Sequence, residues 1–318
     1  MNILVIASSS TGTILVNRLI KEEHNVYYVN PFHRSNGISS IPSVYRCINN
    51  SIDFAVICDV GFDREYFLLQ QKKIPTLGGS PFQVKLELDK EIQKQLCKQY
   101  KIRWLKETTN SLCPLTTEIW FCNGEPLYQY INYIKQNRFL TGDLGVEVDC
   151  ESAVYWSNIH RGVESVERIF QQGLFDFLNA IKYTGLFALD ACLSKDDLYP
   201  YVFNIIPRLQ AGPLSCMLSL YNDSFGNLLG DLLSNKSHSI ILQDKIAIGV
   251  AISQPPYPYG DNGLYKYIVS TGDDWKCIRK DIAKQIKEIK IPNLQYRIDG
   301  GIQAEYLDDL RKHSYYKN

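Results

Sequence analysis

Several features that would identify a function at once are missing from this sequence of 318 residues. Charge of one sign is not in excess, because 34 Lys and Arg residues balance 34 Asp and Glu residues. No basic block or stripe stands out, so nucleic acid is not expected as a partner. The 9 cysteines include no CxxC pair, and the 5 histidines show no HxH or HExxH spacing. These patterns argue against a disulfide framework and against a zinc site.

Long apolar runs are missing as well. No stretch reaches the roughly 20 apolar residues of a membrane-spanning helix, so no membrane partner is expected. Met1 leads directly into the short apolar segment NILVIA, without the charged start and cleavage motif of a signal peptide. The odd number of cysteines fits free thiols in a reducing compartment. We therefore expect a globular protein located in the cytoplasm.

Two apolar, β-rich runs lie close together in the second half of the sequence. Residues 186–192 include Asp190, residues 199–206 include Asn204, and the polar residues between the runs predict a turn, hence a β-hairpin. An acid and an amide inside buried strands cost free energy unless something pairs with them. Asp190, Asn204 and Arg208 beyond the strand end are therefore the first candidates for a site. The alternative is a satisfied core pair with a surface arginine.

The N-terminus predicts a strand over residues 2–7, a loop of small residues and a helix. The loop and the helix start consist of Ser9, Ser10, Thr11 and Gly12. This arrangement presents helix amides to an anion in many α/β proteins. The hydroxyl groups either contact a phosphate or only cap the helix, and both interpretations stay open.

Further strands are predicted at residues 25–29 and 51–60. Asp59 lies at the end of the second of these, where ligands bind in doubly wound sheets. Gly79 and Ser80 follow a third, short strand and predict a tight turn.

The middle of the chain predicts a helix over residues 82–100 that carries Lys90, either on a solvated face or at a ligand. A strand pair over residues 118–133 and a polar loop over 135–145 follow, and Gly145 lets that loop approach a ligand or simply turn. Residues 102–114 are expected to be irregular. Later helices are predicted at 163–181, 226–233 and 275–289, with a β-rich region starting at 246.

Taken in order, these segments resemble glycinamide ribonucleotide synthetase, that is phosphoribosylamine–glycine ligase, within the wider ATP-grasp family. The resemblance covers nearly the whole chain, through NILVIASSSTG, LGGSPFQVKLELDKEIQKQL, WFCNGEPLYQYINYIKQNRFLTGDLG, YTGLFALDACL with VFNIIPR, and AIGVAISQPPYPYG with IPNLQYRIDGG. It implies an α/β fold with an α+β core. The implied parts are a parallel-sheet domain at 1–82, a truncated ATP-grasp core at 83–240 and a small β-rich, α+β domain at 241–318.

The resemblance also implies roles for single residues. Lys90 would contact ATP, while Asn204 and Asp190 would hold Mg²⁺. Arg208, with Asp190 close by, would stabilise an acyl phosphate. The implied substrate contacts are Ser9, Ser10, Thr11, Gly12, Asp59, Gly79, Ser80 and Gly145.

The chain departs from the family at three places. ATP-grasp ligases cover ATP with a lid subdomain, and the segment between Tyr100 and Glu118 leaves no room for one. The family has a glutamate two residues before the metal-ligating asparagine, where this chain has Val202, so a carboxylate that Mg²⁺ favours is lost. At the front, Ser9, Ser10 and Thr11 replace the family's glycines and arginine.

Two functions are compatible with these patterns. We predict a protein that has lost catalysis and acts as a binding or assembly module without a cofactor, its partner being a phosphorylated small molecule or nucleotide, another protein or a second copy of itself. The alternative is an active ATP-dependent carboxylate–amine ligase that uses Mg-ATP and forms an acyl phosphate. Water would enter a site without a lid and hydrolyse that intermediate, which favours the first function.

Overall fold

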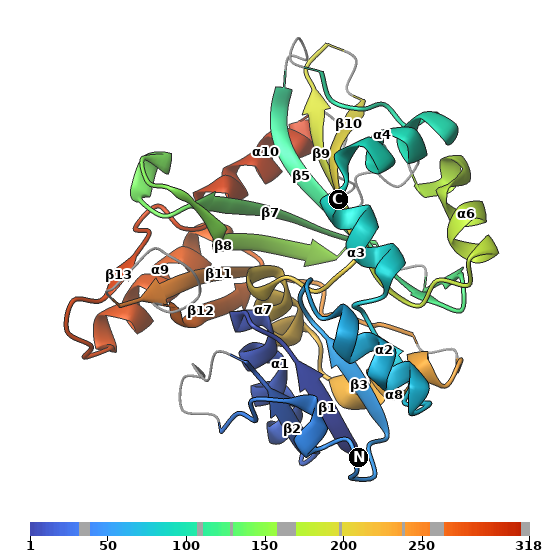
Figure 1. Ribbon diagram of the computed structural model, residues 1–318. Coiled ribbons are helices and arrows are strands. Elements are labelled where there is room, and N and C mark those ends of the chain that lie inside the picture. Colours follow the sequence, from blue (N-terminus) through green and yellow to red (C-terminus); the bar gives the residue numbers. More distant parts are fainter. Residues whose placement is uncertain are drawn as a thin grey trace.

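The structure is a computed structural model, which describes residues 1–31, 39–106, 111–127, 130–157, 170–196, 199–236, 239–254 and 264–312. Its strands form a small parallel sheet near the N-terminus and a large antiparallel sheet, with helices against both (Figure 1). This arrangement confirms the predicted α/β fold class. No helix in these ranges is both long and apolar enough to cross a membrane.

The N-terminal sheet is parallel, with the strand order β2-β1-β3-β4. Its elements are β1 (Asn2–Ile6), α1 (Ser10–Lys21), β2 (Asn25–Val29), β3 (Phe54–Ile57), α2 (Asp63–Gln71) and β4 (Thr76–Leu77). β3 is apolar and buried along its whole length, as is usual for a parallel strand covered on both faces. The predicted first strands and first helix are confirmed here: β2 has the predicted bounds, β1 ends one residue earlier, and β3 covers only residues 54–57 of the predicted 51–60.

The large sheet has the strand order β10-β9-β5-β7-β8-β11-β12, while β6 pairs with β5 and β13 with β11. Its strands are β5 (Ser111–Cys122), β6 (Glu125–Pro126), β7 (Ile131–Arg138), β8 (Glu147–Ser157), β9 (Gly185–Ser194), β10 (Pro200–Ile206), β11 (Ile246–Ser253), β12 (Leu264–Gly272) and β13 (Gln295–Tyr296). Because β11 pairs directly with β8, the strands after residue 240 continue the sheet of the core.

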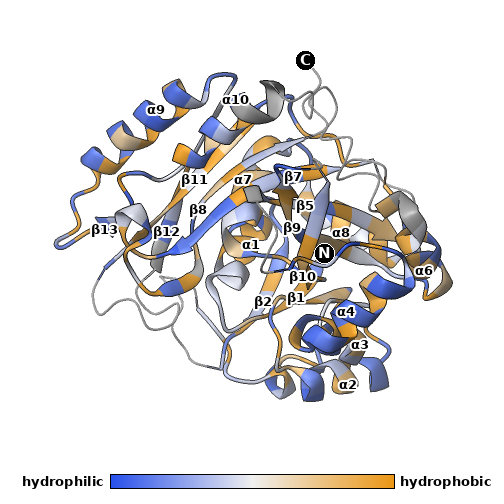
Figure 2. Ribbon diagram, turned by 90° about the horizontal axis from the view of Figure 1, so that it is seen from above, coloured by the Kyte–Doolittle hydropathy of each residue, from blue (hydrophilic) through white to orange (hydrophobic). Residues whose placement is uncertain are grey.

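Helices cover both faces of this sheet. They are α3 (Pro81–Leu88), α4 (Lys90–Gln99), α6 (Phe175–Ala180), α7 (Ala211–Leu220), α8 (Phe225–Leu233), α9 (Trp275–Glu288) and α10 (Glu305–Lys312). In Figure 2, α9 shows many hydrophilic residues, and its buried residues are Ile278, Ile282 and Ile286 at helical spacing. α7 lies between the N-terminal sheet and the large sheet (Figure 1).

The predicted helix over residues 82–100 is in fact two helices. Asp89 causes the break, because its backbone is extended and its carboxylate accepts hydrogen bonds from the amides of Glu91 (3.0 Å) and Ile92 (3.2 Å). Asp89 is therefore the N-cap of α4, and Lys90 is the first residue of that helix. This places the Lys90 side chain at a helix junction.

Other differences concern elements that the sequence pattern did not indicate. β7 continues to Arg138, into the segment predicted to be a loop, and β5 begins at Ser111, within the segment predicted to be irregular. β8 and α7 were not predicted at all. The predicted helix over 163–181 lies partly outside the described residues, and its visible end is a short π-helix (Phe170–Leu174) followed by α6.

β10 is the edge strand of the large sheet, yet its outer backbone groups are paired. The amide of Val202 donates to Arg103 O, and the amide of Leu105 donates to Val202 O, both at 2.8 Å. The Gln93 side chain accepts a hydrogen bond from the Ile205 amide (3.3 Å) and donates one to Ile205 O (3.2 Å). These contacts satisfy backbone groups that an edge strand otherwise exposes, and they hold α4 beside β10.

Candidate functional site

The predicted hairpin is confirmed as β9 and β10, and its register brings the candidate residues together. Asn204 lies opposite Asp190, and a β-bulge separates this pair from the pairing of Val202 with Ala191. Because neighbouring residues of a strand alternate between faces, Val202 and Ala191 point away from Asp190 and into the core. Residue 202 is therefore not placed to add a carboxylate beside Asn204.

Asp190 is almost fully buried, with 2% of its surface exposed, and both oxygens of its carboxylate have partners. The Thr116 hydroxyl donates to Asp190 Oδ1 (2.5 Å), and the Asn204 side-chain amide donates to Oδ2 (3.0 Å). Lys135 Nζ lies 3.1 Å from the same Oδ2 and forms an ion pair with it. Each carboxylate oxygen thus has a partner, as a buried charge requires.

Lys135 was missed by sequence reasoning, which assigned it to a polar loop. It is in β7, and its ammonium also donates to Gln210 Oε1 at 3.1 Å. Gln210 is fixed in turn, because its amide donates to the hydroxyl of Tyr133 at 2.8 Å. The ammonium of Lys135 is therefore held between an aspartate and an amide oxygen, and its side chain is only 13% exposed.

Lys90 joins this group from α4. Its ammonium contacts Asn204 Oδ1, with Gln93 Oε1 at 3.3 Å and Phe203 O at 3.5 Å. Lys90 is an exposed residue, and within the described part of the chain no carboxylate oxygen lies within 4.0 Å of its ammonium. We call Lys90, Lys135, Asp190 and Asn204 the polar centre.

The charges around Lys90 act on its pKa in both directions. Partial burial lowers the pKa, the carboxylates of Asp190 and Glu87 raise it, and Lys135 lowers it again, with a net lowering. Lys135 and Asp190 act on Lys90 because the four groups of the polar centre lie close to one another.

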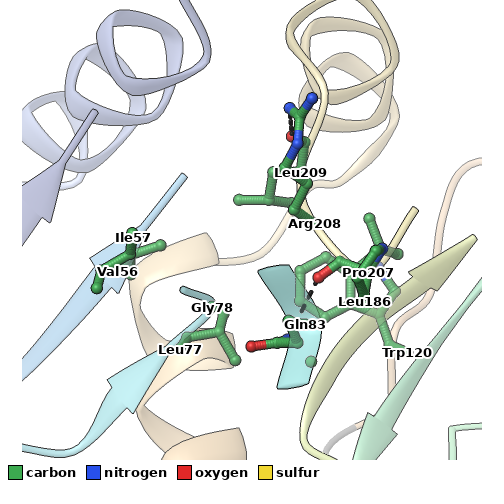
Figure 3. A pocket seen from close by; sticks show the side chains of 11 residues that line it. Val56, Ile57, Leu77, Gly78, Gln83, Trp120, Leu186, Pro207, Arg208 and Leu209 are labelled. Atoms are coloured by element: carbon green, nitrogen blue, oxygen red, sulfur yellow. Dashed lines mark hydrogen bonds between the residues drawn. The ribbon is translucent and has the colours of Figure 1, made fainter. Parts of the chain in front are cut away.

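Arg208 lies near the polar centre but is bound elsewhere. Its Nε donates to Glu87 Oε1 at 2.7 Å, so Arg208 forms an ion pair with Glu87, a residue of α3. A small cavity of about 20 Å³ beside Arg208 has room for little more than one water molecule. Its lining residues are Val56, Ile57, Leu77, Gly78, Gln83, Trp120, Gly185, Leu186, Pro207, Arg208 and Leu209 (Figure 3). The guanidinium points away from Gln83 and Pro207. The residues that line the cavity between the two sheets are mostly apolar.

The N-terminal loop binds a carboxylate of the chain itself. The amides of Ser8 and Ser9 donate to Asp59 Oδ2 (2.7 and 2.9 Å), and the Ser9 hydroxyl donates to Oδ1 (2.6 Å). Ser9 also caps α1, by accepting a hydrogen bond from the Thr11 amide. The amides of Ser8 and Ser9 and the hydroxyl of Ser9 are therefore already used by a group of the chain itself.

The structure gives the surroundings of the other residues proposed as substrate contacts. Ser10 starts α1, and Thr11 is buried. A side chain at Gly12 would meet Ala7, and one at Gly79 would meet Ile57. Ser80 is the N-cap of α3 in a capping box with Gln83. A side chain at Gly145 would collide with Leu140 in its own loop.

The oxygens of the polar centre do not form a fitting site for Mg²⁺. That ion requires about six oxygen ligands, usually with carboxylates among them. Asp190 Oδ2 is bound to Lys135, and Asn204 Oδ1 is bound to Lys90. No cluster of three or more His, Cys, Asp or Glu side chains suited to a metal occurs among the residues that the structure describes.

A second polar group lies beside the centre on the same face of the sheet. Tyr133 stacks on Tyr155 with ring centroids 5.8 Å apart, and the Tyr155 hydroxyl donates to Glu118 Oε1 at 2.7 Å. Glu118 is buried, and desolvation raises its pKa to about 7, although the hydrogen bond from Tyr155 lowers it. Sequence reasoning placed Glu118 at the start of a strand pair and did not single it out as a buried carboxyl.

Comparison with known proteins gives a likeness in fold. No family model and no curated protein sequence matches the chain. Phosphoribosylamine–glycine ligase from Thermotoga maritima superposes with a TM-score of 0.72 at 13% identity, over 94% of this chain and 100% of that one. N5-carboxyaminoimidazole synthetase from Staphylococcus aureus gives 0.62 at 10% identity, over 90% and 97% of the two chains. A putative ATP-grasp superfamily protein from Archaeoglobus fulgidus gives 0.54 at 13%, over 86% and 99%. The chain therefore has the fold of ATP-grasp proteins.

Proposed function

We propose that this protein of ATP-grasp fold is not a ligase and that it binds a nucleotide or another phosphorylated small molecule at the polar centre. The observation that supports binding is the ammonium of the exposed residue Lys90, whose contacts in the described residues are neutral oxygens. Two lysines and one aspartate give the polar centre one net positive charge, since Arg208 and Glu87 neutralise each other. An anionic group of the ligand would balance this charge.

Three observations argue against catalysis. Only residues 100–110 connect α4 to β5, which is too short for a lid subdomain. Water therefore has access to an acyl phosphate formed here. The oxygens of Asp190 and Asn204 face lysines, and Arg208 is bound to Glu87.

The proposed ligand contacts Lys90 and not the N-terminal loop, because Asp59 already accepts hydrogen bonds from the amides of that loop.

A thermal shift experiment tests this proposal, with ATP, ADP and ribose 5-phosphate as probes. A ligand at a hundred times its dissociation constant stabilises the fold by about 2.7 kcal/mol. We expect a rise in melting temperature with at least one probe, and its loss in Lys90→Ala. Lys94→Ala is the matched control, because Lys94 lies on the same helix and pairs only with Glu91 among the described residues.

A second assay separates binding from catalysis. Release of phosphate from Mg-ATP in the presence of amine acceptors is expected to stay at the level of buffer. Release that depends on Lys90 would support the alternative, an active carboxylate–amine ligase using Mg-ATP. If no probe shifts the melting temperature, the binding proposal fails, and a protein partner or self-association becomes the next proposal to test.

A further inference from the structure

The two oxygens that the sequence offered to a divalent cation each contact a lysine. Asp190 Oδ2 lies 3.1 Å from the ammonium of Lys135, and Asn204 Oδ1 contacts that of Lys90. Both ammonium groups belong to the chain itself and come from different elements, β7 and α4. The electrostatic role of a cation at these oxygens is thus filled by side chains.

Lys135 is held firmly in this position. Its ammonium donates to Gln210 as well as to Asp190, and Gln210 is bound by Tyr133. The carboxylate is fixed from its other side by Thr116. Moving Lys135 away would leave a carboxylate that is 2% exposed without a counter-charge, which is strongly unfavourable. A divalent cation bound to the same oxygen would be repelled by the ammonium.

We propose that Lys135, together with Lys90, replaces a divalent cation in this site, so that the polar centre binds the anionic group of its ligand without a metal. Lys135 supplies the fixed positive charge beneath the ligand, and Lys90 supplies the exposed one that contacts it. Mg²⁺ in solution binds phosphates itself and competes with the two lysines. The inference rests on the proposed function for the ligand, but the lysine replacement can be tested by metal binding alone.

The direct test measures Mn²⁺ binding by electron paramagnetic resonance, with Mn²⁺ as a spectroscopic substitute for Mg²⁺. We expect no binding to the wild-type protein and binding to Lys135→Met, where Asp190 Oδ2 has lost the ammonium that pairs with it. Adding Asp190→Asn to that variant should abolish the binding again. Lys98→Met, at an exposed lysine of α4, is the matched control and should behave like the wild-type protein.

The outcomes separate clearly. Mn²⁺ binding to the wild-type protein that is lost in Asp190→Asn would overturn the inference, and so would a folded Lys135→Met that binds no Mn²⁺. If Lys135→Met does not fold, the wild-type protein still gives a test through the best probe of the thermal shift series. Its affinity should be equal or higher in EDTA than in excess Mg²⁺, and a rise of about tenfold or more with Mg²⁺ would overturn the inference. Failure of every probe to bind would contradict the proposed function only.

Discussion

Glu118 is a residue whose titration should be visible in the stability of this protein. Its pKa in the folded state is raised to about 7 by burial, against 4.5 as the ordinary value. A carboxyl with a raised folded pKa stabilises the fold while protonated. That contribution is fully present below the unfolded pKa and is lost as the pH rises through about 7.

Glu118→Gln should remove this dependence. The amide oxygen can still accept the hydrogen bond from Tyr155, and it carries no charge at any pH. Relative to the wild-type protein, the variant should gain about 3 kcal/mol of unfolding free energy between pH 5 and pH 8.5. Urea unfolding at the two pH values measures this difference. Glu147→Gln, at an exposed glutamate, should show no such gain, and an equal gain in both variants would refute the assignment to Glu118.

At the scale of elements, the sequence predicted those whose apolar pattern is local. β9 and β10 were predicted because each is a clear apolar run, and the acid in one and the amide in the other stand out inside these runs. α7 was missed because AGPLSCMLSL begins like a loop and is apolar on all sides, which matches its burial between two sheets. β8 was missed because its first half, EVDCES, is polar.

The site was predicted in part, for a related reason. Asp190, Asn204 and Lys90 lie together in the structure, and the hairpin register alone joins the first two. Lys135 could not be predicted as a site residue, because a lysine at this point of the sequence indicates a polar loop as long as its partner in the fold is unknown. That partner, Asp190, is distant in sequence and contacts it only through the pairing of β5 with its neighbours. Contacts of this kind are set by the sheet as a whole.

A partly buried ion pair on α1 joins the N-terminal sheet to α7 and α8. Arg18 and Glu22 form the pair, and Arg18 donates to the carbonyl oxygens of Leu218 (3.1 Å), Tyr221 (3.2 Å) and Asp223 (2.7 Å), near the end of α7. Cations are favoured at a helix C-terminus and carboxylates at an N-terminus. One residue pair thus serves the ends of two helices.

Glu22 serves the second of these ends, at the start of α8. Its carboxylate accepts hydrogen bonds from the amides of Phe225 (2.8 Å) and Gly226 (2.9 Å) and from the Ser224 hydroxyl (2.9 Å). Burial alone would raise the pKa of Glu22, but these donors and Arg18 hold it below its ordinary value. The stability that Glu22 provides is therefore present above its unfolded pKa and is lost as the pH falls through the folded pKa.

Glu22→Ala should destabilise the protein by about 2 to 3 kcal/mol at neutral pH, because it leaves charged and amide donors without acceptors. Chemical denaturation at pH 7 measures the loss, and repeating it at acidic pH should show a smaller one. Glu23→Ala is the matched control, since Glu23 is exposed and its positive φ is as strained for alanine as for glutamate. A similar loss in both variants would show that the effect comes from the turn and not from the ion pair.

At the scale of the whole molecule, one hydrophobic cluster joins the two sheets. The cluster around α7 and α8 combines Val5 and Leu15 of the N-terminal part with Trp120 and Tyr155 of the large sheet. A part that buries its apolar face against another part is not stable alone, since exposing that face costs about 25 cal/mol for each Å². Residues 1–82 should therefore not unfold separately from the rest.

Unfolding in urea should accordingly be a single transition, with the same midpoint by far-UV circular dichroism and by tryptophan fluorescence. Phe225→Ala tests the shared core directly, because the Phe225 ring packs edge-on against Trp120 with centroids 6.0 Å apart. The truncation should cost about 3 to 5 kcal/mol and lower both midpoints together. Phe67→Ala, at a ring that is 54% exposed on α2, should leave both nearly unchanged. Two separate transitions, or a Phe225→Ala midpoint that moves by one probe only, would mean that the N-terminal sheet is an independent folding unit and that α7 and α8 do not couple the two sheets.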